Sequence, residues 1–143
     1  MSLITPAGVN TSNYGAAEIQ MPRATLKFPE RFIYTSNRQR GGTEDPRGMY
    51  GELTAGQAYS PVSGDSIAIF SLASNGSFSL VRQVHTGLRD LRGFIIDPSG
   101  RYLVAGGNVA GGVKVFERIH GGTDLIQVAA SEEVPTASTF LWL

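Results

Sequence analysis

The chain has 143 residues and a formal net charge of zero, so it lacks the basic field that nucleic-acid binding requires. It contains no cysteine, which excludes a disulfide framework and thiolate chemistry. Its first residues carry neither a basic segment nor an apolar run long enough for a signal peptide or a membrane span. These properties predict a soluble, cytoplasmic protein that binds neither nucleic acid nor a membrane.

Residues 1–14 lack a hydrophobic period and hold Pro, Asn, Thr and Ser, which is typical of a linker or a frayed start. Apolar and β-branched residues then come in short alternating runs, with Gly, Pro, Asn or Asp between them. This pattern predicts strands and argues against helices. The runs occupy residues 17–22, 31–36, 66–71 and 77–82, and then residues 93–100, 101–107, 112–117 and 124–129.

The second set of four runs repeats the order of the first set. Phe70 and Phe116 fall at equivalent places, as do Pro22 and Pro98. A repeated unit of four short strands is typical of a β-propeller blade. The sequence therefore predicts an all-β fold of four-stranded antiparallel meanders. A first blade is expected at 15–84 and a second at 91–131, with the opening strand of a third at 134–143.

Two blades do not close a propeller, which needs at least about four. The sequence therefore leaves two alternatives, a piece of a longer protein or several copies that complete one ring. The first blade also holds a long insertion, residues 38–64, between its second and third strands. A connection of this length without periodicity is usually functional or disordered. Any helical turn of the chain is expected there.

Several small motifs carry structure and not chemistry. Residues 97–100 (DPSG) and 75–76 (NG) are turn sequences. The glycine-rich run 106–112 joins two strands and does not lead into a helix, which excludes a phosphate-binding loop. The two histidines, His85 and His120, are expected at opposite ends of the blades, so neither a metal nor a cofactor is predicted.

The loops of an antiparallel meander alternate between two ends of the blade, and this sorts the polar residues. Arg38 and Arg92 are expected at one channel mouth, together with His85 and the nearby Glu18. Guanidinium groups that converge there suit a small acidic substrate, and His or Glu can move a proton. The alternative is that these arginines are solvated or pair with a local acid such as Asp90.

Four motifs in order carry a family resemblance: residues 31–38 (RFIYTSNR), 65–70 (DSIAIF), 85–87 (HTG) and 91–105 (LRGFIIDPSGRYLVA). Together they resemble the C-terminal blades of the seven-bladed lactonase family. That family includes 6-phosphogluconolactonase and the fungal 3-carboxy-cis,cis-muconate lactonizing enzyme. Residues 16–19 and 140–143 are more similar to the fungal branch.

The resemblance implies lactone hydrolysis or muconate cycloisomerisation on an acidic substrate. It gives Arg38 and Arg92 as anion binders, and Glu18 and His85 as the catalytic groups that handle the proton. The alternative is a non-catalytic propeller fragment, acting as a binding or assembly module or as an inactive truncated product. Its open sheet edges would favour self-association.

Overall fold

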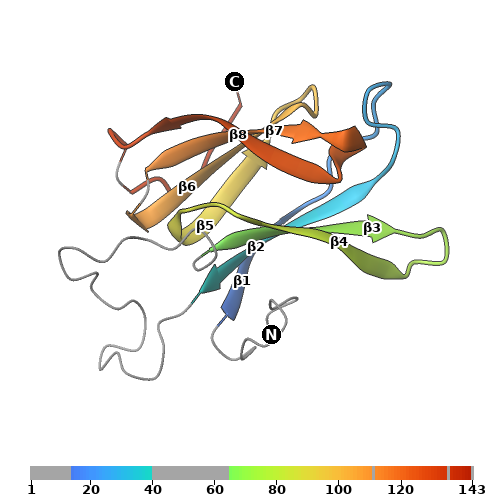
Figure 1. Cartoon of the computed structure of the whole chain (residues 1–143), viewed down its shortest axis with the longest axis horizontal. Coiled ribbons are helices and arrows are strands. Elements are labelled where there is room, and N and C mark those ends of the chain that lie inside the picture. The colour runs from blue at the N-terminus through green and yellow to red at the C-terminus, as the bar shows by residue number, and fades with distance from the viewer. Residues whose placement is uncertain (1–13, 40–64, 111, 135, 143) are drawn as a thin grey trace.

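The computed structural model of the chain describes residues 14–39, 65–110, 112–134 and 136–142. Within them, eight strands form two four-stranded sheets, shown in Figure 1. Their bounds, in chain order, are β1 (Tyr14–Gln20), β2 (Phe32–Gln39), β3 (Ser66–Leu72), β4 (Phe78–His85), β5 (Arg89–Ile96), β6 (Tyr102–Ala110), β7 (Val113–Ile119) and β8 (Asp124–Ser131).

Each sheet is an antiparallel meander, because its strands pair in the order in which they follow one another in the chain. The all-β prediction of two propeller blades is therefore confirmed. The turn sequences also behave as predicted: the amide of Gly100 donates to the carbonyl of Asp97 (2.8 Å), and that of Gly76 to Ala73 (3.0 Å).

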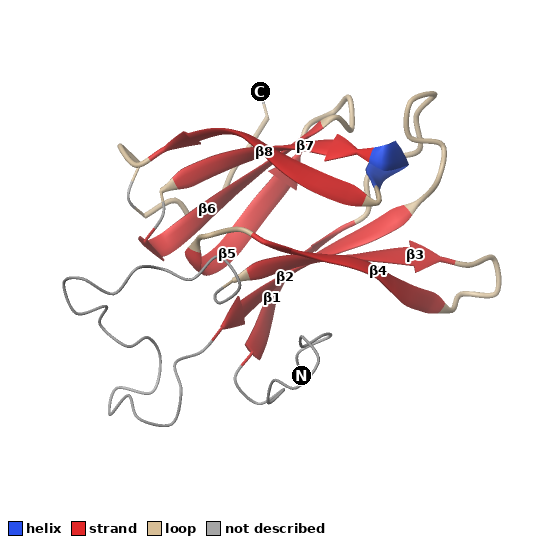
Figure 2. Cartoon of the chain, viewed as in Figure 1, coloured by secondary structure: helices blue, strands red, loops and turns tan. Residues whose placement is uncertain are grey.

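A single helical turn lies in the described part of the chain, the 3-10 helix η2 (His120–Gly122), drawn in blue in Figure 2. It joins β7 to β8 and bends sharply because Gly121 and Gly122 have φ angles of 70° and 101°, which glycine adopts without a steric penalty. The sequence placed a helical turn in the insertion instead. Residues 40–64, like residues 1–13, lie outside the described residues.

No strand is assigned in the described tail, residues 136–142, so the opening strand expected at 134–143 stays a prediction. The tail lies against β5 and β6. A Cβ atom at Gly106 would lie 2.6 Å from the carbonyl oxygen of Ala137, and Trp142 donates its indole N–H to the carbonyl of Ile96 (3.2 Å). The described residues hold no further strand with which a blade's first strand could pair.

The hydrophobic core lies between the two sheets. Alternate side chains of β2 and β3 point toward the second sheet, and those of β5 to β8 meet them, as the period of two requires. The inner strands β1 and β5 are also joined by the Gln20 amide, which donates to Phe94 O (2.7 Å) and accepts from Ile96 N (3.1 Å). The buried core residues are Phe32, Tyr34, Ile67, Ile69, Leu88, Leu91, Phe94, Ile96, Leu103, Ala105, Phe116 and Leu125.

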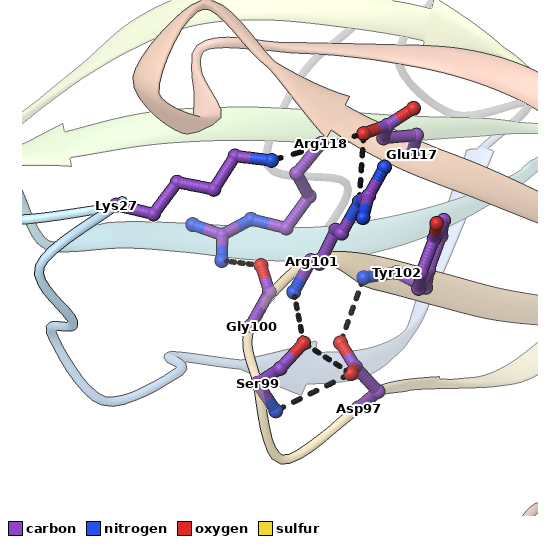
Figure 3. Close-up of polar contacts among 8 residues, drawn as sticks. All are labelled: Lys27, Asp97, Ser99, Gly100, Arg101, Tyr102, Glu117 and Arg118. Atoms are coloured by element: carbon purple, nitrogen blue, oxygen red, sulfur yellow. Dashed lines mark hydrogen bonds and ion pairs between the residues drawn. The ribbon is translucent and has the colours of Figure 1, made fainter.

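One buried cation crosses from the second sheet to the first. Arg118 on β7 is 1% exposed, and its guanidinium carbon lies 4.3 Å from the ring centre of Phe28 and 5.0 Å from that of Tyr34. Its Nε donates to the Tyr34 hydroxyl (2.7 Å). Its Nη1 donates to the carbonyl of Gly100, as Figure 3 shows. The Tyr34 hydroxyl in turn donates to Gly122 O (2.6 Å). These contacts tie the two blades together.

The connections sort into two ends, as the sequence analysis predicted. At the crossing end β2 and β6 end, β3 and β7 begin, and the β4–β5 connection lies. The hairpin end carries the β1–β2, β3–β4, β5–β6 and β7–β8 connections. At the crossing end, Thr86 N donates to Asp65 O (3.0 Å), and Leu91 N donates to an oxygen of the Asp65 carboxylate (2.5 Å). At the hairpin end, Arg118, Gly100 and Gly122 meet.

The Arg118 contacts should be a main source of stability. Replacing Arg118 with Met keeps most of the length but removes the ring contact and two hydrogen bonds from a buried site. We expect the free energy of unfolding, measured by urea denaturation, to fall by about 2–4 kcal/mol. The matched control is Arg82→Met, because Arg82 also joins the sheets, through Asp124 at 3.2 Å, but its side chain is 58% exposed. That variant should lose less than about 1 kcal/mol. Equal losses of unfolding free energy in the two variants would show that the burial of Arg118 does not account for its contribution.

The outermost strands leave apolar side chains exposed. Phe78 and Leu80 on β4 are 52% and 49% exposed, and Ile126 and Val128 on β8 are 52% and 50% exposed. Since unpaired edges and apolar patches attract partners, we expect the isolated chain to self-associate with rising concentration in sedimentation velocity experiments. Lysine at Ile126 and Val128 should return it toward a monomer. A parent chain that stays monomeric at every concentration would disprove this expectation.

Candidate anion-binding site

Two arginines from different blades meet at the crossing end. Arg38, near the end of β2, places Nη1 3.2 Å from Oδ1 of Asp90. Arg92, on β5, places Nε 2.7 Å from Oδ2 of the same carboxylate. The structure therefore brings together the two arginines that the sequence named as anion binders, and the group that joins them is Asp90.

The backbone of β5 is irregular where it supplies these groups. Its pairing with β6 shifts register between Arg89 and Leu91 and again between Leu91 and Gly93. Asp90 has a φ of 54°, in the left-handed region, which aspartate tolerates better than most residues with a Cβ. Because a β-bulge redirects the side chain of its extra residue, this irregularity explains how Asp90 reaches across to the first blade.

The Asp90 carboxylate is 1% exposed and accepts a further hydrogen bond, from Nδ2 of Asn108 (2.9 Å). Two guanidinium groups and one carboxylate leave the cluster with one net positive charge. The Arg38 side chain is 20% exposed, and its Nε is buried with no hydrogen-bond partner among the described residues. The Arg92 side chain is 48% exposed. Partly exposed guanidinium groups of this kind can contact an acidic ligand.

His85 lies at the same end but apart from the arginine pair. It ends β4, the outermost strand of its blade, where it is paired with Ser66 of β3, which in turn is paired with Asn37 of β2. Two strand spacings separate His85 from Asn37, a distance of roughly 10 Å. Its Nδ1 is buried without a hydrogen-bond partner in the part of the chain that the structure describes.

Glu18 lies inside the innermost strand and not at its start, because β1 begins at Tyr14. Arg38 is paired with Gly15, so Glu18 lies three residues farther along β1, or about 10 Å from that level. It is half-buried at a register shift between Ala16 and Ile19, and its amide donates to the Ser36 hydroxyl (2.9 Å). The structure does not bring Glu18 to the two arginines.

The pairing of both arginines with Asp90 is the alternative that the sequence offered for them. The sequence does not indicate Asn108 as a member of the cluster, because it lies in a glycine-rich connection. The available signal was the order Arg-Asp-Leu-Arg at residues 89–92, which places one acid between two basic residues at the blade crossing. The positive φ of Asp90 could not be predicted from the sequence, because the bulge in β5 depends on how β5 pairs with β6.

Asp97, at the hairpin end, serves the turn that its sequence predicted. Figure 3 shows its carboxylate accepting from the Ser99 hydroxyl and from the amide of Tyr102 (2.7 Å). Burial alone would raise the pKa of Asp97, but the hydrogen bonds from Ser99, Tyr102 and Arg101 favour the ionised form, and the net result is a lowered pKa. This carboxylate has a structural role.

The lowered pKa of Asp97 gives a pH dependence with a definite sign. Its contribution to stability should be fully present above about pH 4, the unfolded-state range, and lost as the pH falls through the folded-state pKa. Asp97→Asn should therefore be less stable than the parent at pH 7, and the difference should shrink toward pH 2. Urea denaturation at several pH values measures this. A difference that does not change with pH would refute the assignment.

Two further observations concern the described residues. No group of three or more His, Cys, Asp or Glu side chains there is arranged to hold a metal ion. No helix in those segments is long and apolar enough to cross a membrane.

Stacked four-stranded meanders with basic groups on an inner strand define a segment of a β-propeller. Residues 2–142 match the family described as "Lactonase, 7-bladed beta-propeller", and the chain belongs to that family. No curated protein gives a significant match to the sequence.

The solved structures that resemble the chain are much longer. A protein from Lactobacillus plantarum superposes with a TM-score of 0.58 at 21% identity, over 87% of this chain and 28% of its own length. Two putative 6-phosphogluconolactonases match less well. The one from Bacteroides fragilis has a TM-score of 0.48 at 22% identity, over 80% of this chain and 24% of its own length. The one from Bacteroides uniformis has a TM-score of 0.47 at 24% identity, over 79% of this chain and 25% of its own length. The chain thus spans about a quarter of the length of these relatives.

Proposed function

We propose that this chain supplies the acid-binding side of the substrate site in a lactonase-type propeller. The observation that carries the proposal is the pair of guanidinium groups, Arg38 and Arg92, joined through one buried carboxylate at the crossing end. Two partly exposed guanidinium groups at one place suit a carboxylate or phosphate group, which a guanidinium can grip with two hydrogen bonds. The ligand is therefore a small acidic molecule.

The reaction proposed for the whole protein is hydrolysis of a sugar-acid lactone of the 6-phosphogluconolactone type. When water attacks the lactone carbonyl, negative charge develops on oxygen, and preplaced guanidinium groups stabilise it. The ring opens to a carboxylate, and one group must accept the proton of the attacking water. Closure of a muconate to a lactone passes through related charges and is the second candidate reaction of the same site.

Glu18 and His85 are the proposed proton-transfer groups. Glu18 is the better placed of the two, because β1 is the first strand of its blade and the first strand lies next to the axis of a propeller. His85 lies on the outermost strand of that blade. Both act in this proposal on a substrate that the arginines hold. The protein is proposed to work in the cytoplasm.

A non-catalytic role is the alternative, in which the chain serves as a binding or assembly module. The exposed apolar side chains of β4 and β8 favour it, since they offer a surface to a partner or to a second copy. Turnover by the completed propeller separates the two functions. If a propeller that includes this chain binds an acidic ligand but releases no acid from 6-phosphogluconolactone in a pH-stat assay, the binding module is the correct description.

The anion site is tested by titration with 6-phosphogluconate. Arg38→Ala and Arg92→Ala should each weaken binding by about 10- to 100-fold, the scale of a charge-assisted hydrogen bond. His120→Ala is the control, because His120 lies at the hairpin end and should leave the affinity unchanged. Isothermal titration calorimetry on the parent and the three variants measures the dissociation constants. Equal affinities across all four proteins would remove the proposed anion site.

A further inference from the structure

The proposed anion site does not explain why a buried carboxylate, Asp90, lies between its two arginines. A carboxylate beside the binding groups weakens the attraction of any acidic ligand, yet this one is 1% exposed and contacts both arginines. We infer that Asp90 is a positioning residue, which holds Arg38 and Arg92 at a fixed separation so that both can contact one acidic group. This inference rests on the proposed function.

The hydrogen bonds divide between the two carboxylate oxygens in a way that fits this role. Oδ1 accepts from Arg38, which comes from the first blade, at 3.2 Å. Oδ2 accepts from Arg92 (2.7 Å) and Asn108 (2.9 Å), which come from the second blade. Two guanidinium groups repel each other, and the carboxylate between them removes that repulsion. The distance between the arginines is therefore set by a bridge across the blade interface.

The backbone that carries Asp90 is itself held in place. Asp90 has a φ of 54°, and the residue that follows it, Leu91, donates its amide to the buried Asp65 carboxylate at 2.5 Å. The main-chain carbonyl of Asp65 accepts from the amide and the hydroxyl of Thr86, in the crossing between the blades. A strained backbone conformation persists where its surroundings determine it in this way, and such residues are common at binding sites.

The positioning role and a simple electrostatic role predict opposite results. Asp90→Asn raises the net charge of the cluster from one positive charge to two, so electrostatics alone predicts tighter binding of an anion. Asparagine also tolerates the left-handed backbone, which keeps the bulge. Arg38 and Arg92 contact different oxygens of Asp90, and asparagine replaces one of these acceptors with an NH2 group that cannot accept from a guanidinium. A positioning role therefore predicts weaker binding despite the added positive charge.

The experiment uses the whole chain, with 6-phosphogluconate and inorganic phosphate as probes. We expect Asp90→Asn to weaken the binding of 6-phosphogluconate about tenfold or more. Asp124→Asn is the matched control, since it makes the same charge change at the hairpin end, where Asp124 is paired with Arg82. It should change the affinity less than about twofold. In nitrogen-15 spectra, the Arg92 Nε–H signal should be protected from exchange in the parent and lose that protection in Asp90→Asn.

The outcomes separate the inference from the proposed function. A parent chain that binds neither probe overturns the proposed function, and the positioning role falls with it. A parent that binds, with Asp90→Asn folded and equal or tighter in affinity, overturns the positioning role alone. If Asp90→Asn does not fold, Asn108→Ala replaces it, because it removes one donor to Asp90 without a charge change. It should weaken binding about threefold, and an unchanged affinity then overturns the inference.

Discussion

The packing of the two blades depends on one buried cation, the guanidinium of Arg118. It lies between the rings of Phe28 and Tyr34 and gives its hydrogen bonds to the Tyr34 hydroxyl and to the Gly100 carbonyl. Burial raises the pKa of the Tyr34 hydroxyl, and the nearby positive charge of Arg118 opposes that effect. Rings and neutral oxygens thus replace water around a charge that is 1% exposed.

The arrangement at the hairpin end has consequences for the crossing end. With β2 held against the second blade by Tyr34, the far end of the same strand carries Arg38 to the start of β5. There Asp90 meets it, and the two blades share a second polar contact. The chain therefore joins its sheets by apolar packing in the middle and by an arginine at each end, one fully buried and one partly open to solvent.

The sequence was sufficient to predict the strands, the blades and the two ends, because alternation and turn residues act locally. The 97–100 turn formed where Pro and Gly required it. The opening strand expected at 134–143 stays a prediction, because pairing needs a second strand, which an alternating pattern alone does not supply. The sequence indicates Asp90 as an acid that can pair with an arginine, but not that it joins both. That role follows from a register shift between β5 and β6, and a register is a property of two strands together.

Gly93 and Gly106 determine how closely another segment can pack on the outer surface of the second blade. At both positions a side chain would collide with the main chain of residues 137–139. The outer surface of β5 and β6 therefore receives a polypeptide segment at close range, by its backbone at Gly93 and by its backbone and side chains at Gly106. Alanine at either position leaves every hydrogen bond of the β5–β6 ladder possible, but its Cβ would displace the main chain of residues 137–139. The absence of a Cβ at Gly93 and Gly106 thus sets how closely a neighbouring segment can approach this surface.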